Sequence, residues 1–513
     1  MKFATLMLMA LIVAVFLPTQ AAAATCESLS TLSLPHTTIT AAESVAAGAY
    51  APAAPAGAKG GKGGGGGAKG GNAFANLPAF CRVAVTSKPS SDSDIKIEYW
   101  LPVAASWNGN FEANGNGGWS GSITPATLGT GMQKGYATAM TDTGHDGGSA
   151  SFALGHPEKL TDFGYRSVHE MAVTGKALIT SFYGRAPKHS YWNGCSAGGR
   201  QGLKEAQMFP EDFDAIVAGS PGLNWTGRST QAVWIAQATH KEEGSAIPAA
   251  KFTVIKDAVL AACDAKDGAK DGVLEDPTKC KFDPSVLLCK DADGPTCLTK
   301  AQVETAKTIY SDVTNPKTKK VIFPGHEPGS ESGWNTMAGA NPMGIGLDLF
   351  KYVVFADPNW DYKTLNFDSD IDKALKLDTA ADAMDPNLKG FFARGGKMIQ
   401  YHGWSDPQIS PRSSVDYYKS VVNAMGGLST VQNNYRLFMV PGMAHCGGGD
   451  GTSTFDMLTA LENWVDTGKA PDSILASRAS DGRTRPLCPY PQVAVYKGSG
   501  SIEEAANFSC KVQ

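Results

Sequence analysis

The sequence has little excess charge of either sign, and this absence narrows the kinds of partner that it can have. Its 45 lysine and arginine residues are nearly balanced by 49 aspartate and glutamate residues, which gives a formal net charge of −4 at pH 7. Charged residues make up only 18% of the chain. A nucleic-acid binder needs a basic face that neutralises phosphates. We therefore do not expect nucleic acid as a partner.

The sequence also lacks an apolar run long enough to cross a bilayer, which takes about 18 or more residues. At the N-terminus, Lys2 precedes a shorter apolar run over about residues 6–16, followed by a proline. Small residues then fit an A-x-A cleavage site near residues 21–24. This order predicts a cleaved secretory signal over residues 1–24 rather than a membrane anchor. The mature protein is expected to be secreted or periplasmic, without membrane attachment.

One internal segment, residues 48–73, consists almost entirely of glycine, alanine, proline and lysine. Such a segment cannot bury enough apolar surface to offset the entropy lost on ordering, so a flexible loop is expected. The alternative is that its lysines, Lys59, Lys62 and Lys69, bind an anionic surface.

After this loop, short apolar runs alternate with helical stretches. The first run, "DIKIEYWLP", alternates like an edge strand. Strands and helices in turn predict an α/β protein with a mostly parallel sheet covered by helices. The pattern lapses between about residues 221 and 385 and then resumes with "GGKMIQYHGWSDP". We therefore expect a main domain in two parts, residues 25–220 and 386–513, interrupted by a lid domain over residues 221–385.

The pentapeptide "GCSAG", residues 194–198, matches the G-x-S-x-G motif and lies between a predicted strand, "SYWN", and a predicted helix, "GRQGLKEAQMF". This is the context of a nucleophile elbow, where flanking glycines permit a strained turn that exposes the serine hydroxyl. Ser196 is therefore the candidate nucleophile. Cys195 beside it is the alternative, because a thiol ionises more readily than a hydroxyl.

A serine nucleophile needs a histidine base and a carboxylate that orients it, and α/β-hydrolases carry them in the order Ser, acid, His. "YHGWSDPQISP" follows a predicted strand and offers Asp406, and "FMVPGMAHCGGG" follows another and offers His445. His402 and His145 compete for the role of base, and Asp142 for that of acid. Because His402 shares a segment with Asp406 and His145 precedes the serine, we interpret both as pocket or structural histidines.

The tetrahedral intermediate of such a reaction needs hydrogen-bond donors aimed at its oxyanion. The backbone N–H of Ala197, directly after the serine, is the expected first donor. The loop "GNGGWSG" after an early strand offers the second, from Gly117 or Gly118.

The chain holds ten cysteines, and an even number in an exported protein predicts disulfides. Short separations favour three pairs: Cys263 with Cys280, Cys289 with Cys297, and Cys488 with Cys510. Four cysteines remain: Cys26, Cys81, Cys195 and Cys446. Cys195 directly precedes the candidate nucleophile and Cys446 directly follows the candidate base. A disulfide between these two would tie the two loops together.

Over nearly its whole mature length the sequence resembles the tannase and feruloyl esterase family. The matching segments are "NGGWSG", "GYATAMTDTGH", "GHPEKLTDFGYRSVHEM", "YWNGCSAGGRQGL", "HGWSDPQISP" and "PGMAHCGGG". The family's Cys-Ser, Asp and His-Cys pattern falls on Cys195-Ser196, Asp406 and His445-Cys446. The resemblance implies an α/β-hydrolase fold with a large inserted lid, and activity on aromatic carboxylic esters, chiefly ferulates and gallates. Hydrolases of mono-(2-hydroxyethyl) terephthalate share this fold and pattern.

The resemblance also implies a disulfide between Cys26 and Cys81 and a structural calcium ion in the lid. "CDAKDGAKDGV" carries three aspartates within eight residues, and such hard oxygen ligands suit Ca²⁺. The spacing D-x-x-D-G-x-x-D-G is not that of an EF-hand. The family's ligands map onto Asp264, Asp267 and Asp271 and onto the backbone carbonyls of Ala269 and Val273. The ion would order the lid, far from the chemistry; a solvated acidic turn is the alternative.

Several aromatic residues could stack on an aromatic acyl group, although each could equally belong to a core. They are Trp225, Trp234, Trp334, Phe355, Trp360 and Trp404. The resemblance favours a feruloyl esterase, then a tannase, then a terephthalate monoester hydrolase. The expected substrate is a small aromatic ester, free or attached to plant cell-wall polysaccharide. A cysteine hydrolase and a non-catalytic phenolic- or glycan-binding protein on the same scaffold are the rivals.

Overall fold

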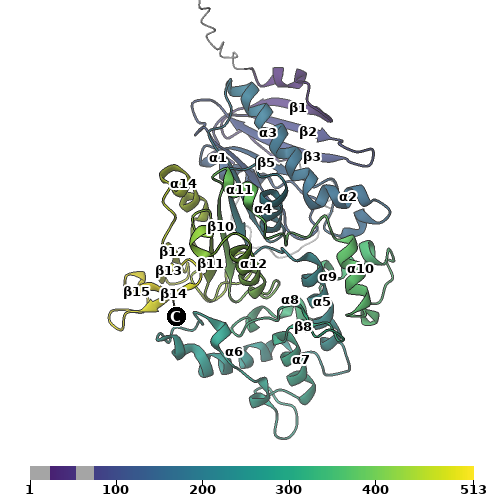
Figure 1. Cartoon of the computed structure of the whole chain (residues 1–513), viewed down its shortest axis with the longest axis vertical. Coiled ribbons are helices and arrows are strands. Elements are labelled where there is room, and N and C mark those ends of the chain that lie inside the picture. The colour runs from purple at the N-terminus through teal and green to yellow at the C-terminus, as the bar shows by residue number, and fades with distance from the viewer. Residues whose placement is uncertain (1–23, 53–73, 513) are drawn as a thin grey trace, which may run out of the picture.

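The computed structural model describes residues 24–52 and 74–512 (Figure 1). The predicted signal, apart from its last residue, and most of the predicted flexible loop lie outside these residues. The centre of the molecule is a nine-stranded sheet. Its strands, in their order across the sheet, are β1 (Thr37–Val45), β2 (Phe80–Ser87), β3 (Ile95–Pro102), β5 (Ala137–Thr141), β4 (Phe111–Asn114), β6 (Ser190–Cys195), β7 (Ala215–Gly219), β10 (Lys397–Gly403) and β11 (Tyr435–Val440).

The sheet is mixed: β1, β2, β3 and β5 pair antiparallel, and β5, β4, β6, β7, β10 and β11 pair parallel. β5 and β7 are buried along their whole length, as expected for parallel strands covered on both faces. One sequence prediction is wrong, because β3 is not an edge strand but pairs with β2 and β5. Its polar residue Glu98 is buried in an ion pair with Arg82 at 2.8 Å, and β1 takes the edge.

Helices cover both faces of the sheet. Those outside the insertion are α1 (Pro125–Gln133), α2 (Pro157–Thr161), α3 (Ser167–Tyr183), α4 (Ala197–Met208), α11 (Lys389–Ala393), α12 (Arg412–Ala424), α13 (Leu428–Val431) and α14 (Met457–Thr467). Alternate residues of β7 show the two layers, as the two-residue period of a strand requires. Ile216 and Ala218 belong to the apolar cluster of α3, α4 and α12, whereas Ala215 and Val217 belong to that of α14.

The predicted insertion, residues 221–385, lies within the segment between β7 and β10, two strands that are neighbours in the sheet. It contains α5 (Trp225–Thr239), α6 (Ala249–Cys263), α7 (Lys300–Tyr310), α8 (Asn335–Ala338), α9 (Gly344–Asp348), α10 (Ser369–Leu377), β8 (Val313–Thr314) and β9 (Val321–Phe323). Most of it lies below the sheet in Figure 1 and has its own apolar core, with Ile235 and Phe252 among its members. α5 also places Trp225 in a cluster with Trp119, which follows β4. This helix therefore joins the insertion to the sheet.

After α14 the chain adds two small antiparallel pairs, β12 (Ile474–Ser477) with β13 (Thr484–Leu487), and β14 (Gln492–Tyr496) with β15 (Phe508–Val512). The N–H of Ala494 in β14 donates to Glu275 of the insertion at 2.6 Å, so the C-terminal part contacts the insertion directly. Among the residues that the structure describes, none of the helices combines the length and hydropathy needed to cross a membrane.

Candidate active site

Ser196 lies in the sharp turn between β6 and α4. Its backbone has φ 64° and ψ −120°, a positive φ that residues other than glycine adopt rarely. The N–H of Ser196 donates to the Gly219 carbonyl at 2.9 Å, which ties the turn to the end of β7. A Cβ on Gly194 would lie 2.6 Å from the backbone carbonyl carbon of Gly198, so this close approach requires glycine. A strained turn with flanking glycines is the geometry of a nucleophile elbow.

Asp406 lies in the loop after β10 and is completely buried. Its Oδ1 accepts the backbone N–H groups of Gln408 at 2.8 Å and Ile409 at 3.0 Å. Burial alone would raise the pKa of this carboxyl, but the charges and hydrogen bonds of His445 and His402 outweigh it and hold the pKa well below its ordinary value. Asp406 is therefore an anion at neutral pH.

His445 lies in the loop after β11, with 13% of its side chain exposed. Its Nδ1 is 2.7 Å from Oδ2 of Asp406, which leaves Nε2 as the ring nitrogen for proton transfer. A disulfide between Cys195 and Cys446, with their Cα atoms 6.0 Å apart, joins the residue before Ser196 to the residue after His445. The predicted acid and base thus lie together, and the base is covalently tied to the serine turn.

The ten cysteines form five disulfides, and the structure has no free cysteine. The other four pairs are Cys26 with Cys81, Cys263 with Cys280, Cys289 with Cys297, and Cys488 with Cys510. All five expected pairings are confirmed. Because Cys195 is bonded, it offers no thiol that could act as the nucleophile in this structure.

The competing histidines have other partners. His402 is fully buried, with Nδ1 2.7 Å from Ser414 Oγ and Nε2 3.1 Å from Asp406 Oδ2, so it is a second partner of the acid. The four-residue separation between His402 and Asp406 was the one signal of this contact in the sequence. His145 stacks on Phe152 with ring centroids 3.8 Å apart, and burial lowers its pKa. These contacts fit structural roles.

Asp142, the competing acid, accepts the backbone N–H groups of Lys96 at 2.9 Å and Gly144 at 2.8 Å. Burial raises its pKa to about 6. Within the described ranges its carboxylate has no hydrogen bond to a histidine ring, since only the backbone N–H of His145 donates to the Asp142 carbonyl, at 3.5 Å; it lacks the partner that a triad acid needs.

The expected oxyanion donors lie around the serine turn. Ala197 is the first residue of α4 and is fully buried. The loop with Gly117 and Gly118 follows β4, which pairs with β6, and Asn116 N–H donates to Gln201 of α4 at 3.1 Å. A Cβ on Gly118 would lie 3.1 Å from Ile345 of the insertion, whereas one on Gly117 would meet nothing within 4 Å. A side chain at Gly117 would therefore point into open space.

The selected aromatic residues separate into different clusters. Trp225 is buried in the same apolar cluster as Ala197, and Phe355 and Trp360 pack against that cluster. Trp334 belongs to the core of the insertion and Trp234 packs against it, whereas Trp404 belongs to a core cluster under the sheet helices. Trp119 and Phe163 also line the Trp225 cluster, with ring centroids 4.9 and 5.8 Å from that of Trp225, and sequence reasoning missed both.

Two basic side chains of the insertion also lie near Asp406, and no motif marked them. Burial lowers the pKa of His326 to about 4, partly opposed by Asp406, so this histidine is neutral at neutral pH. Burial lowers the pKa of Arg228 to about 10, and Asp406 is the charge that opposes this shift. Arg228 therefore stays cationic.

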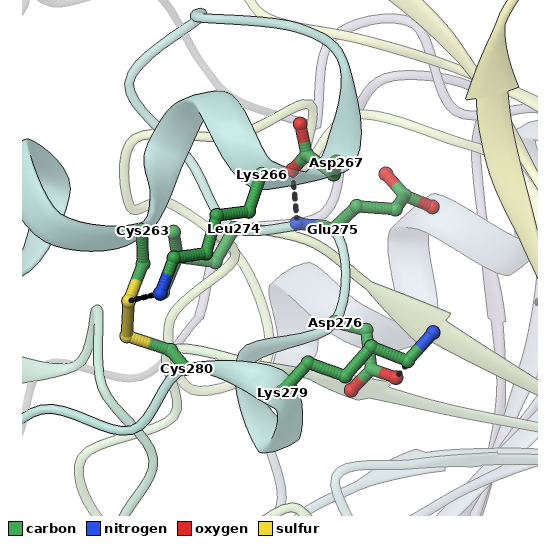
Figure 2. Close-up of a pocket in the computed structure, with 8 residues that line it drawn as sticks. All are labelled: Cys263, Lys266, Asp267, Leu274, Glu275, Asp276, Lys279 and Cys280. Carbon is green, nitrogen blue, oxygen red and sulfur yellow. Dashed lines mark hydrogen bonds and ion pairs between the residues drawn. A yellow bond between two sulfur atoms is a disulfide. The ribbon is translucent and has the colours of Figure 1, made fainter.

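The predicted calcium ligands lie after α6, beside the small pocket of Figure 2. Burial raises the pKa of Asp264 and of Asp267, and the negative charge of Asp271 adds to both shifts. Asp271 is partly neutralised by an ion pair with Arg485. Figure 2 shows the Asp267 carboxylate accepting the N–H of Glu275, at 3.1 Å. The three carboxylates disfavour one another's charge, but their oxygens do not form a compact set in which all lie within 4.8 Å of one another.

One residue of this loop, Val273, contacts the segment that carries His445. A Cβ on Gly442 would lie 2.4 Å from Cγ1 of Val273, so glycine at this position gives Val273 room against the loop that carries His445. The ion pair between Lys256 of α6 and Asp450, at 2.7 Å, joins the insertion to the other side of the same loop. Val273 thus contacts a residue that precedes the candidate base by three positions.

A model of the family described as "Tannase and feruloyl esterase" matches residues 81–511. The chain belongs to this family. Membership makes the protein a carboxylic ester hydrolase. It is similar to an uncharacterised esterase of Xanthomonas campestris pv. campestris, with 41% identity over 96% of this chain and 92% of that protein. A probable feruloyl esterase B-1 of Aspergillus terreus is 36% identical over 84% of this chain and 86% of that protein.

Solved structures of relatives support the fold of this tannase and feruloyl esterase family member. Feruloyl esterase B from Aspergillus oryzae matches with a TM-score of 0.86 and 31% identity, over 95% of this chain and 99% of that one. Tannin acyl hydrolase from Aspergillus niger matches with a TM-score of 0.75 and 22% identity, over 93% and 92% of the two chains. At that identity the second match shows the fold alone. The predicted α/β-hydrolase fold is confirmed.

Proposed function

We propose that the protein is a secreted serine esterase that hydrolyses esters of plant phenolic acids, with feruloyl esters as its first substrate class. The observation that carries the proposal is the Asp406–His445 pair, bonded at 2.7 Å and tied to the Ser196 turn by the Cys195–Cys446 disulfide. The similarity to probable feruloyl esterases, of which the Aspergillus terreus protein is 36% identical, supports ferulate as the acyl group of the substrate.

In the proposed reaction, His445 Nε2 takes the proton of Ser196 Oγ as this oxygen attacks the ester carbonyl carbon. The backbone N–H of Ala197 and one from Gly117 or Gly118 hold the oxyanion. The intermediate collapses, the C–O bond to the alcohol breaks, and His445 gives its proton to the departing alkoxide. Water, deprotonated by His445, then attacks the acyl-enzyme and releases the acid and Ser196. Asp406 stabilises the imidazolium in both halves.

Secretion and calcium are part of the proposal. The apolar stretch within residues 1–24 and five disulfides support an oxidising compartment, the medium or the periplasm. We assign a structural Ca²⁺ to the carboxylates of Asp264, Asp267 and Asp271 and the carbonyls of Ala269 and Val273. When bound, the ion would neutralise these carboxylates and order their loop, with no part in bond making.

Tannase activity is the second candidate, because the family model covers tannases as well as feruloyl esterases. Purified mature protein should be assayed on methyl ferulate, methyl gallate and p-nitrophenyl acetate. We expect the highest kcat/KM on methyl ferulate, and a fall of about 10⁴-fold or more for Ser196→Ala. Absence of turnover on all three esters would favour the non-catalytic binding protein. Activity that survives Ser196→Ala, with a reactive thiol at Cys195, would favour the cysteine hydrolase.

A further inference from the structure

Arg228 lies in the first turn of α5, the helix that joins the insertion to the sheet. It is only 5% exposed. Its Nε and Nη1 atoms are buried and, within the part of the chain that the structure describes, have no hydrogen-bond partner. Buried arginines are normally paired, because a desolvated charge without a partner is strongly unfavourable.

A second arginine shows that the surroundings can satisfy such a group. Arg200 and Arg228 both place their guanidinium carbon 5.4 Å from the centre of the Trp225 ring, and both are buried. Arg200 donates to three backbone carbonyls, those of Gly164 at 2.7 Å and of Ala381 and Phe163 at 3.3 Å. Only Nε of Arg200 is buried without a partner, whereas in Arg228 both Nε and Nη1 are.

Asp406 is the acidic group whose charge acts on the pKa of Arg228, but its carboxylate oxygens already have hydrogen-bond partners. Its two carboxylate oxygens bind His445, His402 and two backbone N–H groups. No hydrogen bond joins it to Arg228 in the described residues. The guanidinium therefore carries a charge that no protein carboxylate is free to neutralise.

The segment around Arg228 lies beside the serine turn and carries further unpartnered polar atoms. The N–H of Gly222 donates to the Ser196 carbonyl at 3.2 Å, and Trp225 shares an apolar cluster with Ala197. Buried side-chain atoms without a partner are Ser220 Oγ, Trp225 Nε1 and Ser229 Oγ. The indole and guanidinium groups can only donate, so a ligand that satisfies them must bring acceptor oxygens.

We propose that Arg228 is a specificity-determining residue that pairs with a carboxylate on the substrate, so that the preferred esters carry a second, unesterified carboxylate. This inference rests on the proposed esterase function. A carboxylate supplies two acceptor oxygens and the charge that a guanidinium requires, and the two groups can bond bidentately. The carboxylate can belong to the aromatic acid, as in a monoester of a dicarboxylic acid, or to the alcohol, as in an ester of a hydroxy acid.

Two pairs of probes distinguish these sources, and each pair differs only in a carboxylate or its neutral amide. For the acid side, monomethyl terephthalate is compared with methyl 4-carbamoylbenzoate. For the alcohol side, feruloyl glycolate is compared with feruloyl glycolamide. In one of the pairs we expect wild-type kcat/KM to favour the carboxylate by about 10- to 100-fold, the usual range for a hydrogen bond to a charged group.

The variants are Arg228→Met, Arg228→Lys and, as a matched control, Arg200→Lys. Arg228→Met should bring the ratio within the preferred pair close to one, and Arg228→Lys should keep part of the preference. The Tm of Arg228→Met should be equal to or above that of the wild type, because an unpaired buried charge is removed. Arg200→Lys should lower Tm, because it breaks bonds to backbone carbonyls, and leave the ratio unchanged.

The inference is overturned if the wild type hydrolyses methyl ferulate but prefers neither carboxylate, or if Arg228→Met keeps the preference. An equal loss of kcat/KM on both members of a pair would also overturn it, and would show that Arg228 acts through Asp406. If the wild type hydrolyses none of these esters, methyl ferulate included, the proposed function itself fails and the inference falls with it.

Discussion

At the scale of single residues, Asp406 holds the site together, because one carboxylate binds two histidines and two backbone N–H groups. Asp406→Asn keeps the size of the side chain but removes the charge that holds the proton on His445 Nδ1. We expect kcat on methyl ferulate to fall about 10⁴-fold, as in other serine hydrolases that lose this charge. The matched control is Asp142→Asn, which should leave kcat nearly unchanged because the Asp142 carboxylate accepts only backbone N–H groups among the hydrogen bonds described. Similar losses in both variants would contradict the assignment.

The same residue predicts how stability depends on pH. The pKa of Asp406 lies below the ordinary aspartate value, so its stabilisation is complete above that ordinary value of about 3.9 and is lost as the pH falls below it. The wild-type Tm should therefore fall more steeply than that of Asp406→Asn between about pH 5 and pH 2.5. Scanning calorimetry at intervals of half a pH unit measures both slopes. Parallel slopes would show that the carboxylate is not held as an anion.

At the scale of elements, the Cys195–Cys446 disulfide joins the β6–α4 turn to the loop after β11, across 251 residues of sequence. Replacing both cysteines by alanine should lower kcat/KM by about 10- to 100-fold, because His445 then loses its fixed position relative to Ser196. Tm should fall as well, since a long loop is no longer closed. The matched control removes Cys289–Cys297, which closes only 8 residues in the insertion. It should lower Tm less and keep kcat/KM, and an equal loss of activity would argue against a local role.

β4 carries a buried carboxyl that sets a second pH dependence. Burial raises the pKa of Glu112 to about 7, although Asn193 donates to it at 3.1 Å. A carboxyl whose pKa is raised in the folded state stabilises the fold at low pH. This contribution is lost as the pH rises from about 4.5 through 7. Glu112→Gln should therefore raise the free energy of unfolding by about 1–3 kcal/mol at pH 8 and change it little at pH 4.5. Urea unfolding at both pH values measures this.

The control for this prediction is Glu98→Gln, in β3 of the same sheet. Glu98 is buried in an ion pair with Arg82, so its loss should destabilise the protein at pH 8. Opposite signs for the two variants at pH 8 are expected. The same sign would mean that burial does not raise the pKa of Glu112 in the folded state.

Strands, helices and the order of the triad could be predicted because they depend on local patterns. The nucleophile elbow is specified by a short piece of sequence: a strand pattern, "SYWN", a helix pattern, "GRQGLKEAQMF", and the glycines between them. The position of β3 could not be predicted, since Lys96 and Glu98 alternate as in an edge strand while burial depends on β2 and β5 on either side of it. Arg228 and His326 were missed for the same reason, because each reaches Asp406 only through the packing of the insertion.

At the scale of the whole molecule, the insertion and the sheet meet where Val273 packs against Gly442, three residues before His445. A calcium ion held by Asp264, Asp267 and Asp271 would fix this contact from the insertion side. EGTA should therefore lower Tm by about 3–5 °C, the range for loss of a tightly bound ligand. It should also lower kcat, because the loop of His445 loses its support. Calorimetry and an assay on methyl ferulate, each with and without added Ca²⁺, measure the two effects.

Two variants make this last prediction specific. Asp264→Ala combined with Asp267→Ala should start from a lower Tm and show little further change with EGTA, since no ligand set remains. Asp276→Asn is the matched control: this aspartate accepts the N–H of Thr278 at 3.2 Å and is outside the proposed set, so the EGTA shift should persist. An equal EGTA shift in the double variant would remove this loop as the calcium site. A lower Tm with unchanged kcat would keep the ion but separate it from His445, and the Val273–Gly442 contact would then be a packing contact only.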